Sequence, residues 1–494
     1  MTGAPLRILH IASEVAPFSK SGGLADVCSS LPLALGDLGH EVVVFSPRYG
    51  ALREFNPRSE TSETSITLNN QTFSIKFLEQ NSDVSGVRFM FVECPELFER
   101  NGYYYDPLTN SDFTDNDARF AVFVCAALTW CKENDWIPQV VHGHDWQAGG
   151  APLFMRSPRF EHAFDSSRFV FTIHNMAFQG RFHSGSRVWF DHAEDLADIG
   201  GPAEFHGMFN LLKLAIELAD AINTVSPTYA HELRTVENMS FGLGPLLHKR
   251  HGHFFGILNG LDTTVWNPET DEHLPVQFNS TTLALRNRNK RALCERLELE
   301  YDKSIPLVGM VTRISEQKGF GALLPTVGEL ISEPAQLVVL GSGDPHFEDQ
   351  LKLMEKTYPQ RVRLVTEYNE PLAHLIYGGS DIFLMPSLFE PCGLSQMMAL
   401  RYGAPPVARD TGGLSDTISD VSHDPNSGTG FLFREYSSQA LSAAINRAFG
   451  MFHSTMRWRQ MQRRGMKGDF SWRRSAHVYE EMYKRTLNNP RVVA

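Results

Sequence analysis

The chain of 494 residues has few cysteines and no cysteine framework. The six that it has are Cys28, Cys94, Cys125, Cys131, Cys294 and Cys392, and none of them forms a C-x-x-C pair. This pattern excludes a small disulfide-stapled protein and is typical of proteins from a reducing compartment. We therefore expect a cytoplasmic protein.

Long apolar runs and an excess of positive charge are also missing. No stretch approaches the roughly 18 residues of a membrane-spanning helix, and the N-terminus lacks the charged start, apolar stretch and cleavage site of a signal peptide. The formal net charge is −12, whereas nucleic-acid and anionic-membrane binding need a basic surface. We expect no membrane and no nucleic acid as a partner, and an anionic substrate would need a locally basic pocket.

What the first half of the chain does contain is an alternation of apolar strands and amphipathic helices. A domain takes about 150 residues, so we expect two or three domains. The pattern predicts strands at Arg7–Ala12, Glu41–Ser46, Val87–Val92, Gln139–His142, Arg168–His174 and Ala221–Val225, and helices at Leu24–Leu38, Ala118–Glu133 and Phe209–Ala219. Near-continuous apolar strands between helices indicate a parallel sheet buried on both faces. The polar segment Asn56–Asp83 is better explained as a hairpin or an insertion.

The same pattern restarts in the second half. Strands are predicted at Ile305–Thr312, Gln336–Leu340, Arg361–Val365, Asp381–Met385 and Pro406–Ala408, and helices at Arg286–Leu297 and Gly393–Arg401. The glycine- and histidine-rich stretch His248–Gly256 is interpreted as a linker. We expect an α/β protein with two Rossmann-like doubly wound domains facing a cleft, at residues 1–250 and 251–470. A C-terminal helix within residues 471–494 would return to the first domain.

Two lysine–glycine constellations occur where a predicted strand is followed by a helix. One is Lys20-Ser21-Gly22-Gly23-Leu24, and the other is split between Arg313…Gln317-Lys318-Gly319 and Glu390-Pro391-Cys392-Gly393-Leu394. Backbone N–H groups at such turns favour a bound anion. A tight turn with an exposed lysine explains Lys20–Leu24 alone equally well. Their occurrence in both halves favours a phosphorylated ligand held between two domains.

A nicotinamide-dependent dehydrogenase is a weaker explanation. It requires G-x-G-x-x-G in the first strand-to-helix turn. The turn here, Ser13–Ser19, is too long and does not have glycines in this pattern, and Gly341-Ser342-Gly343 lacks the third glycine.

A metal site is not expected either. His142 and His144 have no third ligand at metal-site spacing, and the histidines at 248, 251 and 253 are interpreted as solvated. Asp115-Asn116-Asp117 resembles a D-x-D that holds a nucleotide diphosphate through a metal ion. It precedes an amphipathic run, however, and is better explained as an acidic helix start.

Among the carboxylates, Glu390 is the strongest candidate for a functional residue. A buried ion pair explains it as well as a ligand does, but nearby N–H groups suit a polar ligand whose hydroxyls need a carboxylate acceptor. Cys392 is not expected to act as a nucleophile, because no histidine lies near it in the sequence to serve as its base.

Taken together, these residues resemble the family of bacterial glycogen synthases and plant starch synthases over essentially the whole chain. The matching blocks, in order, are Lys20–Val27, His142-Gly143-His144-Asp145-Trp146, His174–Gly180, Thr224-Val225-Ser226-Pro227, Gly256–Asp262, Arg313…Gln317-Lys318-Gly319, Pro386–Leu394, Thr411–Thr417 and Ser471-Trp472.

The resemblance implies a two-Rossmann (GT-B) glycosyltransferase that uses no metal and no cofactor. It implies transfer of glucose from ADP-glucose to the non-reducing-end 4-hydroxyl of an α-1,4-glucan, glycogen or a maltooligosaccharide, with retention at the anomeric carbon.

The resemblance also implies roles for individual residues. Lys20, Gly23, Arg313 and Lys318 would hold the diphosphate; His174 and Glu390 would contact the transferred glucose; Asp145 would border the acceptor and donor pocket; Tyr368 would stack on adenine; and the N–H groups of Cys392, Gly393 and Leu394 would bind sugar hydroxyls. Gly22, Asp26, Asn175 and Thr411 complete the expected substrate-binding set. Glu390, His174, Asp145 and Lys20 form the expected catalytic group.

Two positions distinguish this chain within the wider family. Leu388 stands where many members carry a polar residue, which leaves one contact at the rim of the site open. Met398 stands where related sucrose- and UDP-sugar-using transferases carry a second glutamate, which favours the glycogen and starch synthase branch. A same-fold enzyme that uses UDP-glucose or another glucan, and a catalytically silent glucan-binding paralogue, remain the alternatives.

Overall fold

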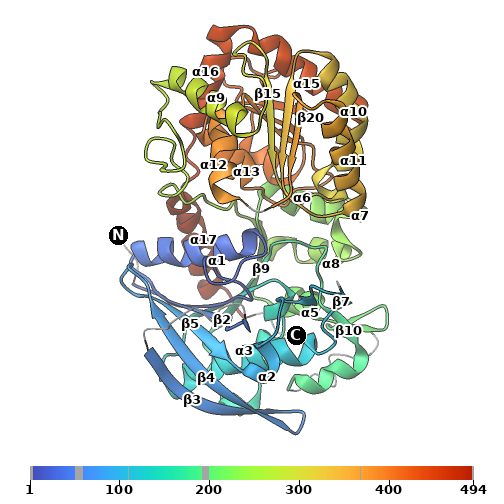
Figure 1. Ribbon diagram of the computed structural model, residues 1–494. Helices are drawn as coiled ribbons and strands as arrows, with labels where there is room; N and C mark the ends of the chain where they lie inside the picture. Colours follow the sequence, from blue (N-terminus) through green and yellow to red (C-terminus); the bar gives the residue numbers. More distant parts are fainter. Residues whose placement is uncertain are drawn as a thin grey trace. The chain divides into compact units, whose positions relative to one another are not determined.

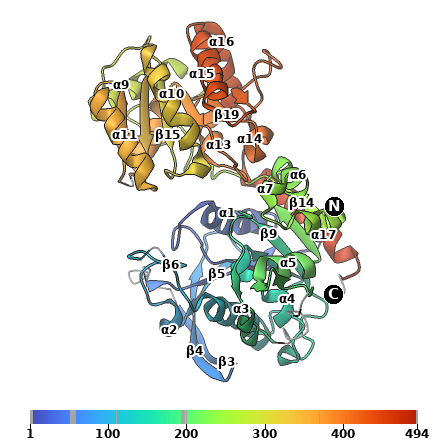
Figure 2. The ribbon, with the colours of Figure 1, turned by 90° about the vertical axis from the view of Figure 1, so that its right-hand side faces the viewer.

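A computed structural model describes residues 4–50, 59–109, 111–191, 198, 200–367 and 369–491. The chain divides into two compact units, drawn from two sides in Figures 1 and 2. The first unit consists of Met1–Val225, Ala230–Gly260 and Trp472–Ala494, and the second of Ser226–Tyr229 and Leu261–Ser471. Each unit is built around its own sheet, with helices on both faces, which is the doubly wound α/β architecture predicted for both halves.

The first unit is built on a nine-stranded sheet with the order β14-β13-β9-β8-β1-β2-β5-β4-β3. Its strands are β1 (Arg7–Ile11), β2 (Glu41–Pro47), β3 (Ser59–Leu68), β4 (Gln71–Asn81), β5 (Val87–Glu93), β8 (Val140–His144), β9 (Arg168–Ile173), β13 (Ala221–Thr224) and β14 (Phe254–Gly256). The strands from β14 to β5 pair in parallel, and β4 and β3 add an antiparallel hairpin at the β5 edge. Short strands lie outside this sheet: β6 (Tyr105–Asp106), β7 (Ser111–Asp112), β10 (Arg181–His183), β11 (Glu204–Phe205) and β12 (Met208–Asn210).

Helices cover both faces of this sheet. They are α1 (Gly23–Asp37), α2 (Pro95–Phe98), α3 (Asn116–Glu133), α4 (Ala151–Phe154), α5 (Leu211–Leu218), α7 (Glu237–Ser240), α8 (Gly244–Lys249) and α17 (Trp472–Asn488), while α6 (Pro227–Thr235) begins in residues grouped with the second unit. Successive residues of β2 point to opposite faces: Val42 and Val44 pack in the core formed by α1 and α17, whereas Phe45 meets Trp130 of α3. Helices α1 and α17 lie side by side in Figure 1 and are in contact.

The sequence of α17 explains why this helix packs on the first unit. Trp472, Ala476, Tyr479 and Tyr483 recur at intervals of four, three and four residues, so they form one apolar face. All four are buried in the core of the first unit. The C-terminal helix is therefore part of the layer of helices that covers the first sheet.

The second unit is built on a six-stranded parallel sheet with the order β17-β16-β15-β18-β19-β20. Its strands are β15 (Leu307–Val311), β16 (Gln336–Leu340), β17 (Val362–Val365), β18 (Ile382–Met385), β19 (Pro406–Arg409) and β20 (Phe431–Phe433). Its helices are α9 (Arg286–Arg296), α10 (Phe320–Ser332), α11 (Pro345–Thr357), α12 (Glu370–Gly379), α13 (Ser395–Arg401), α14 (Gly412–Thr417), α15 (Ser438–Phe452) and α16 (Thr455–Met466).

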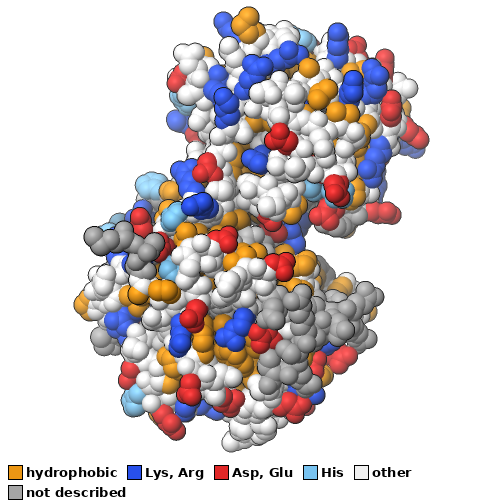
Figure 3. All heavy atoms as spheres, turned by 90° about the vertical axis from the view of Figure 1, so that its left-hand side faces the viewer, with side chains coloured by type: hydrophobic (Ala, Val, Ile, Leu, Met, Phe, Trp, Pro, Cys, Tyr) orange, Lys and Arg blue, Asp and Glu red, His pale blue; other side chains and the backbone are white. Residues whose placement is uncertain are grey.

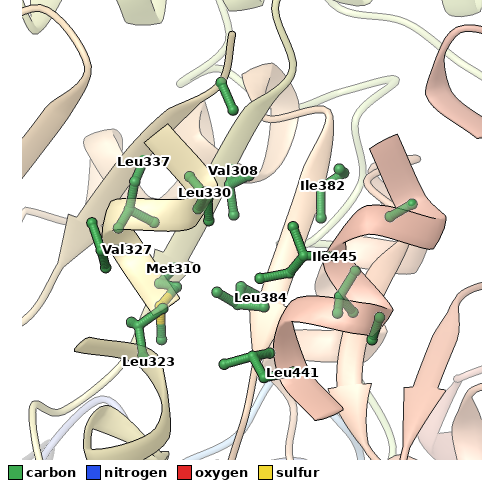
Figure 4. Packing of buried hydrophobic residues seen from close by; sticks show 14 of the residues in the cluster. Val308, Met310, Leu323, Val327, Leu330, Leu337, Ile382, Leu384, Leu441 and Ile445 are labelled. Atoms are coloured by element: carbon green, nitrogen blue, oxygen red, sulfur yellow. The ribbon is translucent and has the colours of Figure 1, made fainter. Parts of the chain in front are cut away.

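Strand alternation divides the core of the second unit into two layers. In β16, Leu337 and Val339 belong to the cluster formed with α10 and α15, whereas Val338 and Leu340 belong to the cluster formed with α9 and α12. Figure 4 shows the first of these layers, where side chains of β15, β16 and β18 meet those of α10 and α15. This two-sided burial is why the strands read as continuous apolar runs in the sequence.

Most predicted elements are present, and three predictions need correction. The expected helix Phe209–Ala219 begins only at Leu211, because Asn210 caps it by accepting a hydrogen bond from the backbone N–H of Lys213 at 2.8 Å. The expected helix Gly393–Arg401 begins at Ser395, since Gly393 has a left-handed φ of 71°. The stretch His248–Gly256 is part of the first unit, where Phe254–Gly256 forms the edge strand β14 beside β13.

The surface carries both signs of charge. On the face drawn in Figure 3, basic and acidic side chains are interspersed, in keeping with the net charge of −12. Among the described residues, none of the helices combines the length and the apolar character that a bilayer crossing requires.

Candidate functional site

The strand order of each sheet reverses at one point, and the candidate residues follow the strands at that point. In the first unit the reversal lies between the neighbouring strands β1 and β8, and in the second it lies between β15 and β18. Loops that leave the carboxyl ends of two such strands diverge to opposite sides and form a crevice where α/β proteins bind ligands. Lys20 and Asp145 follow β1 and β8, and Lys318 and Glu390 follow β15 and β18.

In the second unit, this pairing of strands brings the two halves of the split constellation together. Lys318 Nζ lies 2.7 Å from Glu390 Oε2, and the Ser387 hydroxyl donates to the same oxygen at 3.0 Å. The backbone N–H of Leu388 donates to the carbonyl of Gln317 at 2.8 Å. The Glu390 side chain is only 6% exposed, so these donors take the place of water around its carboxyl group.

Glycines let these loops pack backbone against backbone. Gly319 has a φ of 85°, and a Cβ there would lie 2.0 Å from the carbonyl oxygen of Pro386. Gly412 has a φ of 46°, and a Cβ there would lie 1.9 Å from the carbonyl oxygen of Glu390. The same carbonyl accepts a hydrogen bond from the N–H of Gly413 at 3.1 Å. Both glycines are therefore required by the fold itself, and they hold the Lys318 and Glu390 loops in register.

The remaining predicted residues of the second unit lie around this pair. Arg313 is exposed, and its side chain has no hydrogen bond or ion pair within the described part of the chain. The amides of Gly393 and Leu394 likewise have no acceptor among the described residues. Cys392 is buried beside them, Thr411 is buried at the start of α14, and Tyr368 lies outside the described residues.

The position of Leu388, which departs from the family pattern, has a structural anchor. Its carbonyl accepts a hydrogen bond from the guanidinium of Arg409. Arg409 is the last residue of β19, the strand that pairs with β18. The loop is thus held through its backbone, which does not depend on the side chain at position 388.

In the first unit, the loop between β1 and α1 carries Lys20 and the two glycines. Lys20 is half exposed, and its Nζ lies 2.7 Å from Oδ1 of Asp26 in the first turns of α1. Gly22 is extended, with a φ of −164°, and a Cβ there would meet nothing within 4 Å. Neither the backbone angle nor a neighbour therefore requires a glycine at position 22, in contrast to Gly319 and Gly412.

A buried carboxylate that the sequence did not reveal holds this loop. Glu14 is 2% exposed, and it accepts hydrogen bonds from the backbone N–H and the hydroxyl of Ser21 and from the Tyr104 hydroxyl. The Ser21 hydroxyl lies at 2.7 Å and the Tyr104 hydroxyl at 2.5 Å. A buried carboxylate satisfied in this way fixes the backbone next to Lys20.

Asp145, which directly follows β8, has a backbone that few residues other than glycine adopt. Its φ is 55° and its ψ is −178°, a region that costs a non-glycine residue about 1–3 kcal/mol and recurs at functional sites. Its carboxylate accepts a hydrogen bond from the N–H of His174 at 2.7 Å. Burial raises the pKa of Asp145 to about 7, although the backbone amides of His174 and Asn175 oppose the rise. The structure thus joins Asp145, His174 and Asn175 at the ends of β8 and β9.

Three further histidines lie behind His174, and the four imidazoles form one cluster. His10 Nδ1 is 2.9 Å from His144 Nε2, and His144 Nδ1 is 3.0 Å from His174 Nε2. His142 is bonded on both ring nitrogens, to the Tyr483 hydroxyl at 2.7 Å and to the Thr172 hydroxyl at 2.6 Å. Burial lowers the pKa of His10 and of His174 to about 3 and holds those of His142 and His144 well below the ordinary value. The imidazoles are therefore neutral near pH 7.

The structure supplies metal-ligating groups that sequence spacing did not. Two groups of three side chains have ligand atoms within 4.8 Å of one another: His10, His142 and His144, and Cys28, His144 and His174. They come together because β1, β8 and β9 are neighbouring strands and α1 packs in the same core. The acidic pair at 115 and 117 is not one of these groups. Asp115 is bound by both terminal nitrogens of Arg100 at 2.9 Å, just before α3 begins, as expected for an acidic helix start.

Sequence reasoning missed Glu14 and His10. His10 lies in the apolar strand β1 and Glu14 in the turn after it, and the fold alone explains the sequence pattern of both segments. The one available signal was a charged residue directly after a buried strand, at the end of the strand where ligands bind. For Glu14 this signal is present in the sequence as Ala12-Ser13-Glu14.

Comparisons with known proteins identify the family of the chain. Residues 7–249 match the family model of the starch synthase catalytic domain, and residues 296–464 match that of group 1 glycosyl transferases. The chain is 40% identical over 481 residues to the glycogen synthase of Koribacter versatilis, covering 97% of this chain and 98% of that protein. It is 40% identical over 489 residues to glycogen synthase 2 of Geobacter metallireducens, covering 98% and 100%.

A solved structure extends the similarity to the fold. The catalytic domain of starch synthase IV from Arabidopsis thaliana, bound to ADP and acarbose, superimposes with a TM-score of 0.90 at 34% identity. The similarity covers 98% of this chain and 100% of that one. The chain therefore belongs to the glycogen and starch synthase family of GT-B glycosyltransferases.

Proposed function

We propose that the protein is a glycogen synthase that transfers glucose from ADP-glucose to the non-reducing-end 4-hydroxyl of an α-1,4-glucan with retention of configuration. The observation that carries the proposal is the Lys318–Glu390 pair at the strand reversal of the second unit, in a chain 40% identical to glycogen synthases along nearly its full length. The ADP and acarbose bound by the related starch synthase support a nucleotide donor and a glucan-like acceptor.

The second unit is proposed to bind the donor. An ammonium group has three N–H donors, so Lys318 can hold Glu390 with one and a diphosphate oxygen with another. The exposed guanidinium of Arg313 and the unpaired amides of Gly393 and Leu394 would bind further oxygens of the donor. Glu390 would accept hydrogen bonds from the hydroxyls of the transferred glucose, and Tyr368 would stack on adenine.

The proposed chemistry depends on charge that develops at the leaving group. As the glycosidic bond breaks, negative charge grows on the diphosphate, so fixed cations stabilise the transition state more than the ground state. Lys20, Arg313 and Lys318 would supply that positive charge. No metal ion is needed in this scheme.

The first unit is proposed to take the acceptor and to orient the sugar. The open space in front of Gly22 suits the close approach of a ligand, because neither its angle nor its packing accounts for a glycine. Gly23 and Asp26 would keep Lys20 in position beside it. Asp145, Asn175 and His174 would face the sugar, and Glu14 positions the Lys20 loop through Ser21.

The test is a donor comparison with purified protein and a maltooligosaccharide acceptor. We expect release of ADP from ADP-glucose to exceed release of UDP from UDP-glucose at equal concentrations, with the acceptor lengthened by α-1,4-linked units of retained configuration. Faster release of UDP would favour the UDP-glucose alternative. Absence of product from both donors, with a folded protein, would favour the silent glucan-binding alternative.

A further inference from the structure

We propose that Cys28, His144 and His174 form a binding site for a thiophilic divalent cation, best matched by Zn²⁺, and that the bound ion inhibits the enzyme. The three side chains have ligand atoms within 4.8 Å of one another. Cys28 comes from α1, His144 from the end of β8, and His174 follows β9. The site is thus formed by the same strand ends that carry the proposed sugar-orienting residues.

The ligand chemistry matches Zn²⁺ and its heavier relative Cd²⁺. Thiolate and imidazole are the preferred ligands of these ions, usually in tetrahedral geometry. At normal Zn–S and Zn–N bond lengths, two ligand atoms lie about 3.6 Å apart. The widest separation here therefore needs to close by about 1 Å, which small side-chain rotations supply. The ion would replace the 3.0 Å hydrogen bond between His144 and His174.

Carboxylates near the site favour binding of a cation. Asp145, Glu14 and Asp26 lie close enough to Cys28 to interact with its sulfur through charge. The same three carboxylates attract a divalent ion to the buried site.

The neighbouring group of His10, His142 and His144 is a poorer site. Both ring nitrogens of His142 already have hydroxyl partners, in Tyr483 and Thr172. An ion bound by His142 would have to displace one of these hydroxyls from a buried ring nitrogen. His10 is bonded to His144 through Nδ1, and its buried Nε2 has no partner among the described residues.

Access is through His174. Cys28 and His144 are fully buried, whereas His174 is half-buried and directly precedes the half-buried Asn175. An ion would therefore enter past His174 and draw its imidazole inward. Inhibition rests on the proposed role of His174 at the sugar, while binding of the ion does not.

The first experiment measures the metal–sulfur bond directly. Metal-free full-length protein is titrated with Cd²⁺, and the ultraviolet charge-transfer absorption of a Cd–thiolate bond is recorded. We expect saturation at one equivalent in the wild type and in Cys131→Ala, and no band in Cys28→Ala. Cys131 is the matched control, because it is buried in a helix of the same unit and belongs to neither ligand group of the described residues. Absence of the band in the wild type would overturn the proposal without reference to any variant.

The second experiment measures affinity for Zn²⁺ by competition with a chromogenic chelator. Loss of a ligand should weaken binding by more than the ~10–100-fold that loss of an outer-shell partner costs. We expect this of Cys28→Ala and of His174→Gln, and wild-type affinity of Cys131→Ala. Equal affinity of all three variants would place the ion elsewhere and overturn the assignment. Thermal unfolding of each metal-free variant checks that it is folded.

The third experiment separates the two proposals. Zn²⁺ should inhibit glucosyl transfer by the wild type and by Cys131→Ala, EDTA should restore it, and Cys28→Ala should resist. A Cd²⁺ band without any transferase activity in the metal-free protein would reject the proposed function and leave the ion site standing. Transferase activity without the Cd²⁺ band would reject the ion site and leave the proposed function standing. A Cd²⁺ band without inhibition by Zn²⁺ would reject the proposal that the ion inhibits the enzyme through His174.

Discussion

Removal of the Lys318 ammonium group should disable the enzyme through Glu390. Lys318→Ala deletes a 2.7 Å charge-assisted hydrogen bond to a carboxylate that is 6% exposed and that would keep, among the described residues, only the Ser387 hydroxyl as a partner. Such a bond contributes about 1.5–3 kcal/mol. Since 1.4 kcal/mol corresponds to a factor of ten, kcat/KM for ADP-glucose should fall roughly ten- to hundredfold.

A double-mutant cycle tests whether the two residues act together. Glu390→Ala alone should lower kcat strongly and leave the affinity for ADP within a few fold, because Glu390 contacts the sugar in our proposal. The double variant should be little worse than the poorer single variant, with a coupling energy of about 1 kcal/mol or more. Lys352→Ala is the control, since Lys352 forms exposed pairs with Glu348 and Asp349 in the same unit and should leave kcat/KM unchanged.

Two results would refute this reasoning. Strictly additive effects would mean that removal of Lys318 does not lower activity through Glu390. Near-normal turnover of folded Lys318→Ala would mean that Lys318 is not part of the donor site. Chemical denaturation of each variant is required alongside the kinetics, because unpairing a buried carboxylate also destabilises the fold.

Four further predictions follow from the described contacts. Gly22→Ala should lower kcat/KM about tenfold or more while changing the free energy of unfolding by less than about 1 kcal/mol, and Gly252→Ala, where a Cβ is also unobstructed, should be silent in both assays. Glu14→Gln should raise the KM for ADP-glucose about tenfold, because it removes the charge and one of the two oxygens that accept from the Ser21 N–H and from two hydroxyls; an unchanged KM would mean that Glu14 does not position the loop. Activity should persist in EDTA, and loss restored by a divalent ion would show a catalytic metal. In the second unit, the buried Asp271 accepts hydrogen bonds from the His374 ring at 2.8 Å and from the Tyr402 hydroxyl at 2.5 Å. Asp271→Asn should therefore cost about 1–3 kcal/mol of unfolding free energy at pH 7 without affecting kcat, as measured by denaturation and assay.

The Asp271 prediction has a defined pH dependence. Burial raises the pKa of this carboxyl, but hydrogen bonds from His374 and Tyr402 outweigh burial and bring the pKa below the ordinary 3.8. A lowered folded-state pKa means that the carboxylate stabilises the fold above pH 3.8 and that this contribution is lost as the pH falls through the folded-state pKa. The difference between wild type and Asp271→Asn should therefore shrink below about pH 4. A constant difference down to lower pH would contradict the assignment.

The fold was largely predictable because its signals are local. Val308, Met310 and Val338 belong to strands whose two faces are both buried, so the apolar runs stand out, and turn residues separate them from the helices. The short edge strands Phe254–Gly256 and Phe431–Phe433 were not predicted, since three residues give too little periodicity.

Several candidate site residues could be predicted from the sequence, but Glu14 and His10 and the contacts between residues could not. Lys318 and Glu390 are recognisable from their glycine-rich loops, but their ion pair depends on β15 lying beside β18, which only the tertiary structure determines. The proximity of Cys28 and His174 likewise depends on tertiary structure, because α1 packs in the same core as β8 and β9. The strained backbone of Asp145 leaves no trace in its residue type.

The place of α17 in the first unit has a consequence for biosynthesis. The sheet strands of that unit end at Gly256, and α17 begins about 200 residues later. At 5–20 residues per second, a ribosome needs about 10–40 s to make the intervening chain. During this time His142 lacks its Tyr483 partner, Asn223 lacks its Tyr479 partner, and the sheet face that α17 covers stays open. The first unit to be synthesised is therefore the last to be completed, and chaperones that shield nascent apolar surface have a defined target on it.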